Sequence, residues 1–206
     1  YILFSTMMID NHFSTPMPEL LTLGERILEL AAKQGATAAE TELSEGRGQS
    51  VTVRNGDIET IEYNRDKSIS VTVYDGYKKG SASTSNFSAE SIQDTVEKAI
   101  SIARYTAEDP FSGLAEVDLM PVGVVLPDLD LFHPWALTVQ EAAELAKLGE
   151  QAAFDENKAI QNSEGATVTT QLSQFALLNS LGFAAGIQGS RHAFSCSVIA
   201  GVAESM

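Results

Sequence analysis

The chain has 206 residues and a mass of 22.0 kDa, enough for one large domain or two small ones without disulfides or metals. Hydrophobic residues make up 44% and charged residues 20%, which is a globular composition. Acidic residues outnumber basic ones by 28 to 13, for a net charge of −15. This balance excludes a general nucleic-acid binder, which needs clustered Lys and Arg, and argues against docking on anionic lipid.

The chain begins with Tyr1, and Met7 or Met8 could be the native initiator. Residues 1–15 carry no basic region before their short apolar run, so they make a poor signal peptide. We predict that this stretch is a disordered leader. No apolar run approaches the ~18–20 residues of a membrane helix. The single cysteine, Cys196, excludes an intramolecular disulfide and suits a reducing cytoplasm.

The first predicted element is a helix over residues 19–34, with Pro18 and Gly35 as its start and stop residues. Its apolar residues recur every three or four positions and form one face: Leu20, Leu23, Ile27, Leu30 and Ala31. A β meander follows. Asn55-Gly56 predicts a tight hairpin turn, Asp75-Gly76 predicts a second one, and the small, polar strand over 80–84 reads as a weak edge strand or a site of close backbone approach.

A second helix is predicted from Ser88, a good N-cap, to about Tyr105. Its apolar stripe is Ile92, Val96, Ala99, Ile100 and Ala103. A third helix is predicted from Thr138 to about Phe154, opened by a capping box between Thr138 and Glu141. Its stripe is Ala142, Leu145, Leu148 and Ala152. We interpret all three stripes as faces that pack on the core, with partner binding as the alternative.

A second meander is predicted from about Ile160 to Ala203, with turns at 179–182 and at Gly189-Ser190. The expected fold class is therefore α+β, with helices packed on mostly antiparallel β meanders in the order helix–meander–helix, linker, helix–meander. The linker, residues 107–137, is long for a compact domain. It is either an ordered wrap around the body or a functional loop.

The end of this linker holds the richest local mix of functional groups in the chain. The candidate substrate or partner surface consists of Asp128, Asp130, Phe132, His133 and Trp135. In an extended segment Asp128 and Asp130 would point the same way, and two nearby carboxylates bind cations or transfer protons. The alternative is a loop that covers a helix or sheet end, anchored by its apolar side chains.

The remaining motifs predict no catalytic or metal site. None of His12, His133 and His192 lies in a His-Glu-x-x-His or His-Glu-x-x-x-His pattern. His192 and Cys196 are four strand residues apart, about 13 Å, which is too far to share a metal. Gly46-Arg47-Gly48 and Lys78-Lys79-Gly80 lack the context of phosphate loops, and no Gly-x-Ser-x-Gly occurs.

Several stretches taken together resemble the N-terminal part of the PmbA (TldE) branch of the TldD/PmbA family, also called modulators of DNA gyrase. The resemblance covers about residues 20–200, and each motif is weak by itself. The motifs, in chain order, are Val53–Glu59, Lys79–Ser85, Ala103–Thr106, Pro127–Pro134 and Asn162–Gly165.

The resemblance implies that residues 16–206 form an N-terminal PmbA/TldD-like α+β domain of a cytoplasmic protein, truncated before its C-terminal domain. It implies a subunit of a TldD–TldE zinc metalloprotease complex that acts on unfolded peptides, in microcin maturation and antitoxin degradation. The TldD-type partner would carry the zinc on its His-Glu-x-x-x-His motif. This chain lacks that motif, so the resemblance implies no cofactor here, no catalytic residue and a non-catalytic role. We hypothesise that the subunit helps to shape a cavity for peptide, which adds to a sheet edge.

Two alternatives remain open from the sequence. The first is a stand-alone peptide- or protein-binding module without a protease role, which would use the acidic second half and the loop at 128–135. The second is a direct contact with gyrase or DNA, which the charge balance opposes. Among partners we therefore expect a TldD-type protease subunit and peptides, and neither nucleic acid nor membrane.

Overall fold

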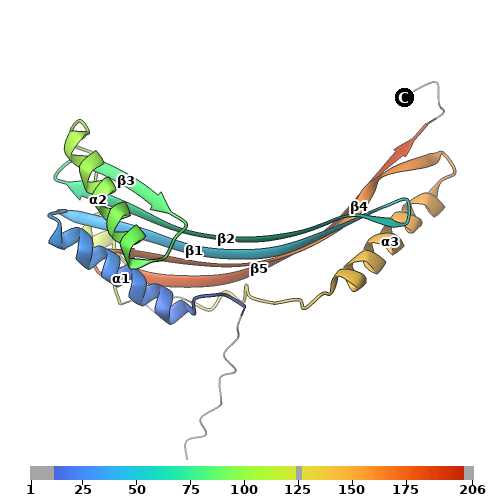
Figure 1. Ribbon diagram of the computed structural model, residues 1–206, viewed down its shortest axis with the longest axis horizontal. Helices are drawn as coiled ribbons and strands as arrows, with labels where there is room; N and C mark the ends of the chain where they lie inside the picture. Colours follow the sequence, from blue (N-terminus) through green and yellow to red (C-terminus); the bar gives the residue numbers. More distant parts are fainter. Residues whose placement is uncertain (1–11, 124–126, 202–206) are drawn as a thin grey trace, which may run out of the picture. The chain divides into compact units, whose positions relative to one another are not determined.

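The computed structural model describes residues 12–123 and 127–201. In chain order its elements are α1 (Met17–Lys33), β1 (Ala38–Arg54), β2 (Asp57–Asp75), β3 (Lys78–Thr84), α2 (Ala89–Tyr105), a short 3-10 helix η1 (Val117–Leu119), α3 (Val139–Glu156), β4 (Ile160–Asn179) and β5 (Ala184–Ala200). The strands form one five-stranded sheet in the order β3-β2-β1-β4-β5 (Figure 1). The predicted α+β class is confirmed. Residues 1–11 of the predicted leader lie outside the described residues.

Neighbouring strands run antiparallel, as the meanders predicted. β2 pairs with β3 from Ile69↔Thr84 to Asp75↔Lys78. Hydroxyl pairs join β1 to β4: Ser50 lies 3.3 Å from Thr169, and Thr52 lies 2.9 Å from Thr167. From the first pair to the second, the residue number increases on β1 and decreases on β4, so these two strands are also antiparallel.

The Asn55-Gly56 turn is confirmed, with φ of 51° and 82° at its two residues. Positive φ at both positions defines the type I′ turn, whose twist matches that of the flanking strands. The second turn lies one residue later than predicted, because Asp75 pairs with Lys78 and leaves Gly76 and Tyr77 in the turn. The predicted turn at Gly189-Ser190 is wrong, since β5 runs through it without interruption.

The chain folds into two compact units. Unit 1 comprises Tyr1–Glu45, Asp66–Asp128 and Gln174–Ile187, and unit 2 comprises Gly46–Arg65, Leu129–Ser173 and Gln188–Met206. No helix in the described part of the chain is long and apolar enough to cross a bilayer.

In unit 1, α1 and α2 lie side by side and supply much of the core (Figure 1). Both predicted stripes are confirmed: Leu20, Ile27 and Ala31 of α1 are fully buried, and the whole stripe of α2 is buried. Ser88 caps α2 by accepting a hydrogen bond from the Ser91 N–H. The buried faces of α1 and α2 pack with Ile69, Val71 and Val73 of β2.

A buried carboxylate fastens the start of α1 in unit 1. Glu45 on β1 is only 5% exposed. Its oxygens accept hydrogen bonds from the N–H and hydroxyl groups of Ser14 and Thr15, at 2.7–3.3 Å, and from the Gln174 amide at 3.3 Å. Burial by itself would raise the pKa of Glu45, but the bonds from Thr15 and Ser14 lower it below its ordinary value of 4.5.

In unit 2, α3 packs against Val51 and Val53 of β1 and against Ala166 and Val168 of β4. The capping box of Thr138 and Glu141 is confirmed. The predicted core stripe is wrong in part, because Leu145 and Leu148 are 39% and 68% exposed. The buried face consists of small residues and one acid: Ala142, Ala143, Ala146 and Glu150. Small side chains allow a close approach of helix to sheet, and a Cβ on Gly149 would collide with the Phe194 ring.

Glu150 connects α3 to the β1–β2 turn. Its carboxylate is 2% exposed and accepts the N–H groups of Asn55 and Gly56 at 3.0 and 2.8 Å. Burial by itself would raise its pKa, but hydrogen bonds from Ser163, Gly56 and Asn55 and the charge of Arg54 lower it below its ordinary value of 4.5. A buried charge is stable only when it is bonded in this way.

Gly80→Ala tests the approach of β3 to α2. A Cβ on Gly80 would collide with the backbone of Ala99 and Ala103, neither of which can rotate away. We expect the free energy of unfolding to fall by about 1–3 kcal/mol, measured by urea denaturation. The control is Gly113→Ala, where nothing lies within 4 Å. Equal stability of the two variants would contradict the close packing described here.

Glu150→Gln tests the bond between α3 and the turn. An amide has one acceptor oxygen in place of two, so one of the two N–H groups loses its partner. We expect a loss of about 2 kcal/mol in the free energy of unfolding at pH 7, measured by urea denaturation. The control is Glu144→Gln on the same helix, where the side chain is 57% exposed and contacts the side chains of Gln140 and Lys147 of its own helix.

The pH dependence of this difference follows from the lowered pKa of Glu150. The carboxylate contributes its full stability above the ordinary pKa of 4.5, and the contribution is lost as the pH falls through the lower pKa of the folded state. The gap between wild type and Glu150→Gln should therefore narrow below pH 4.5. A gap that stays constant into acid would show that the charge of Glu150 is not what matters.

Candidate functional site

The segment that carries most of the predicted site residues, 129–137, lies in unit 2 and runs beside β5. The Ser190 N–H donates to the Leu131 carbonyl at 2.9 Å, and the Ser190 hydroxyl accepts from the His133 N–H at 2.9 Å. Because β5 is the last strand of the sheet, the segment covers part of an open edge. This pairing also explains why the expected turn at Gly189-Ser190 is absent: both residues belong to a paired strand.

His192 holds the predicted residues His133 and Trp135 on β5. Its Nε2–H donates to the His133 carbonyl at 2.9 Å, which assigns the proton to Nε2 because a carbonyl only accepts. Its ring meets that of Trp135 edge-on, with centroids 5.5 Å apart. Its Nδ1 is buried and has no hydrogen-bond partner in the described part of the structure. His192 is therefore an anchor for the segment, whereas sequence analysis considered it as a metal ligand and did not predict this role.

The predicted acidic pair is arranged differently from the expectation. Asp130 has φ of 49°, so the segment is not extended there and the two-residue alternation with Asp128 is broken. Asp130 instead faces His133. The Nε2 atom of His133 lies 2.8 Å from the backbone carbonyl oxygen of Asp130 and 3.5 Å from the Asp130 carboxylate. Asp128 belongs to unit 1 and is exposed, and Phe132 is half-buried in unit 2.

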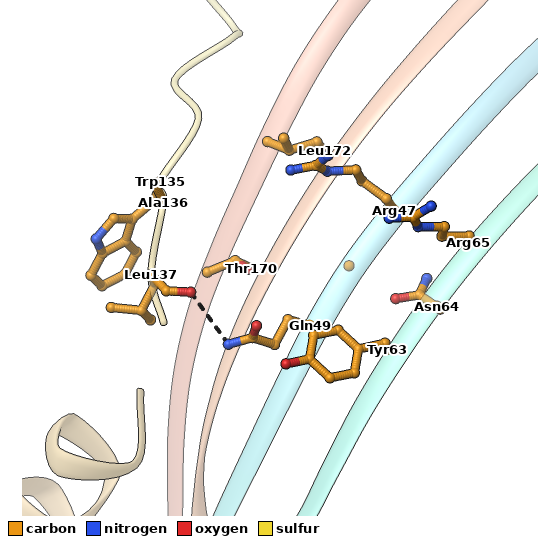
Figure 2. Close-up of a pocket in the computed structure, with 11 residues that line it drawn as sticks. Arg47, Gln49, Tyr63, Asn64, Arg65, Trp135, Ala136, Leu137, Thr170 and Leu172 are labelled. Carbon is orange, nitrogen blue, oxygen red and sulfur yellow. Dashed lines mark hydrogen bonds between the residues drawn. The ribbon is translucent and has the colours of Figure 1, made fainter. Parts of the chain in front are cut away.

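Trp135 is the predicted residue that enters a pocket. This pocket, of about 230 Å³, lies in unit 2 on a face formed by β1, β2 and β4 and bordered by residues 135–137 (Figure 2). Side chains from alternate positions of each strand line it: Arg47 and Gln49 from β1, Tyr63 and Arg65 from β2, and Thr170 and Leu172 from β4. The Gln49 amide donates to the Leu137 carbonyl at 3.5 Å, which ties the border to the sheet.

The pocket is locally basic in a strongly acidic chain. Arg47 and Arg65 lie one after the other across the same face (Figure 2), and none of the residues that line the pocket is acidic. Trp135 and Tyr63 are 46% and 66% exposed, so the pocket also has aromatic surface that is open to solvent. Such a site suits a small anionic group attached to an apolar or amide-bearing chain.

Sequence analysis missed this pocket because its residues come from three strands and a distant segment. Gly46-Arg47-Gly48 was considered only as a phosphate loop, whereas the structure places it within β1. The available signal was the hairpin: a strand pair around Asn55-Gly56, extended far enough, brings Arg47 and Arg65 onto neighbouring strands.

The donor set for a metal can be tested directly. Among the residues that the structure describes, no three His, Cys, Asp or Glu side chains are close enough to hold a metal ion. Cys196 is half-buried, and burial and then the charge of Glu150 raise its thiol pKa, which disfavours the thiolate that binds metals. The described residues therefore do not fit a catalytic zinc.

Two family models match the chain in sequence. Residues 39–103 match the PmbA/TldA metallopeptidase domain 1, and residues 132–206 match the PmbA/TldA metallopeptidase central domain. The chain belongs to the PmbA/TldD family. It is 41% identical over 173 residues to the Metalloprotease PmbA of Escherichia coli O157:H7, a match that covers 84% of this chain and 38% of that protein. The chain thus spans about two-fifths of the length of this PmbA relative.

Solved structures share the fold. A protein from Bacteroides thetaiotaomicron described as a modulator of DNA gyrase superposes with a TM-score of 0.78 at 22% identity, over 86% of this chain and 40% of that chain. TldE from Thermococcus kodakarensis superposes with a TM-score of 0.64 at 14% identity, over 88% of this chain and 40% of that chain. At these identities the likeness concerns the PmbA/TldD fold.

His192→Ala tests the anchoring of segment 131–135. The variant loses the bond to the His133 carbonyl and the ring contact with Trp135, worth about 1 kcal/mol together. Trp135 is the only tryptophan, so acrylamide quenching of intrinsic fluorescence reports on this segment alone. We expect more efficient quenching in His192→Ala and no change in Arg191→Gln, the exposed neighbour on β5. Unchanged quenching in both would show that His192 does not hold the segment.

Proposed function

We propose that this chain is part of a PmbA/TldE-like subunit of a cytoplasmic TldD–TldE zinc metalloprotease complex that acts on unfolded peptides. Maturation of microcin-type peptides and degradation of an antitoxin are the expected tasks. The observation that carries the proposal is the match of both family domains, one after the other, along this chain. The 41% identity to a PmbA protein supports the choice of branch.

In this proposal the subunit is non-catalytic, and the zinc belongs to a TldD-type partner. The support is chemical. The sequence has no His-Glu-x-x-x-His pattern, and the described residues offer no cluster of three metal-binding side chains. A zinc peptidase needs three protein ligands and a carboxylate base at one place. The partner would supply that set, and this chain would supply binding surface.

Two features of unit 2 support a role in binding extended peptide. Every residue over 57–65 of β2 is exposed, and β3 pairs only with residues 69–75 of that strand. Among the described strands, this stretch therefore has a neighbour on one side only, which leaves backbone groups for an added strand. The basic pocket lies beside it, lined by Tyr63 and Arg65 of the same strand.

The test is reconstitution with a TldD-type subunit. Co-purification from a co-expressing strain, followed by cleavage of an unstructured peptide, should show activity in the mixture and none in this chain alone. Zinc measured by mass spectrometry should follow the partner and disappear when the histidines of the partner's motif are replaced by alanine. Cleavage by this chain alone, with stoichiometric zinc, would refute the non-catalytic role. Peptide binding without any association with the partner would favour the stand-alone binding module.

A further inference from the structure

We propose that the pocket formed by Arg47, Arg65, Tyr63 and Trp135 is a subsite for a carboxylate side chain of a bound peptide, so that the subunit selects peptides with a Glu or Asp at one position. The peptide as ligand rests on the proposed function. The preference for a carboxylate rests on the pocket itself.

The two arginines carry the choice of an anion. Both side chains lie across one face of the sheet and line one pocket, and its other lining residues are neutral. Within the described residues neither guanidinium has an ion-pair partner. Two like charges held near each other without a counter-charge are unfavourable, and an anion between them removes that cost. The chain has 28 acidic residues, so the lack of an ion pair at Arg47 and Arg65 does not come from a shortage of carboxylates.

The pocket has room for a side chain, with space beside it for the rest of a peptide. Its volume of about 230 Å³ is enough for a Glu or Asp side chain. An adjoining cavity of about 630 Å³ shares five of its lining residues and leaves room for neighbouring residues of an extended peptide. A guanidinium fork pairs with a carboxylate through two parallel hydrogen bonds, which distinguishes it from the isosteric amide.

The remaining walls fit the uncharged part of a peptide. Trp135 and Leu137 offer apolar surface from the bordering segment, and Tyr63 offers an exposed ring from β2. The methylene groups of a Glu side chain would pack on the Tyr63 ring while its carboxylate reaches the arginines, and Trp135 would contact another part of the peptide at the opposite border of the pocket. His192 has a positioning role, because its edge-on contact and its bond to the His133 carbonyl keep Trp135 at the border.

The charge of the whole chain separates a peptide carboxylate from a polyanion. A nucleic acid brings a row of phosphates and needs a broad basic surface, but the chain carries a net charge of −15. A single carboxylate needs only a local pair of guanidinium groups, and repulsion from exposed acids beyond about 8 Å is screened at physiological ionic strength. The geometry therefore favours one carboxylate over a polyphosphate backbone.

The experiment uses Trp135 as its probe. The chain is titrated with two unstructured peptides that differ only by Glu or Gln at a central position, and the intrinsic fluorescence is followed. We expect saturable binding of the Glu peptide, at least about tenfold tighter than that of the Gln peptide. The double variant Arg47→Gln/Arg65→Gln should lose this preference, while Arg191→Gln keeps it. Thermal melting of each variant verifies that it is folded.

Other outcomes overturn the proposal. Equal affinity for the two peptides, or a preference that survives Arg47→Gln/Arg65→Gln, would show that the pocket does not read a carboxylate. Tighter binding of a single-stranded oligonucleotide through the same arginines would make it a polyanion site instead. Because the titration contains no TldD-type subunit, failure of the reconstitution leaves its result intact, and failure of the titration leaves the reconstitution intact.

Discussion

The bond between the Glu150 carboxylate and the backbone N–H groups of Asn55 and Gly56 is the constraint on which unit 2 depends. The turn residues Asn55 and Gly56 are themselves exposed, but both of their N–H groups point toward the buried Glu150 side chain. Glu150 supplies two oxygens for two N–H groups at 3.0 and 2.8 Å. The buried charge of Glu150 is stable because it is bonded. Without the two N–H groups of the turn, the carboxylate would be buried and would lack these donors. In unit 1, Glu45 fastens the residues before α1 by the same chemistry.

The candidate pocket depends on this constraint through the hairpin. The turn joins β1 directly to β2, so the stretches that carry Arg47 and Tyr63 lie on neighbouring strands of the sheet. The small face of α3 then covers the other end of β1, burying Val51 and Val53. The strand that lines the pocket is thus held at its turn by a carboxylate and along its length by alanines. A functional surface on an exposed strand, β2, needs such rigid support on its neighbour.

Local signals in the sequence predicted most of the secondary structure. The stripes of α1 and α2, the caps at Ser88 and Thr138 and the Asn55-Gly56 turn involve residues close in the chain, and all are confirmed. The failures are long-range. Leucine is more hydrophobic than alanine, so the pattern predicts Leu145 and Leu148 in the buried face of α3. In the structure the close packing of helix on sheet buries Ala143 and Ala146 instead. Gly189-Ser190 predicted a turn. In the structure Ser190 instead bonds to His133, which lies 57 residues earlier in the chain and so outside any local pattern. Residues from three strands line the pocket, so no single stretch of the sequence predicts it.

The chain as a whole has a negative net charge, whereas its pocket is lined by positive side chains. Over the whole chain, a net charge of −15 opposes nucleic acid and other polyanions at long range. Within the pocket, Arg47 and Arg65 meet no acidic lining residue, so an anion that does arrive finds paired donors. The pocket offers one pair of guanidinium groups, which matches a ligand with one carboxylate, whereas the further charges of a polyanion would lie over a chain that is acidic. Under the proposed function, one such position would give selectivity, since backbone pairing is the same for every peptide and only the side-chain contact differs.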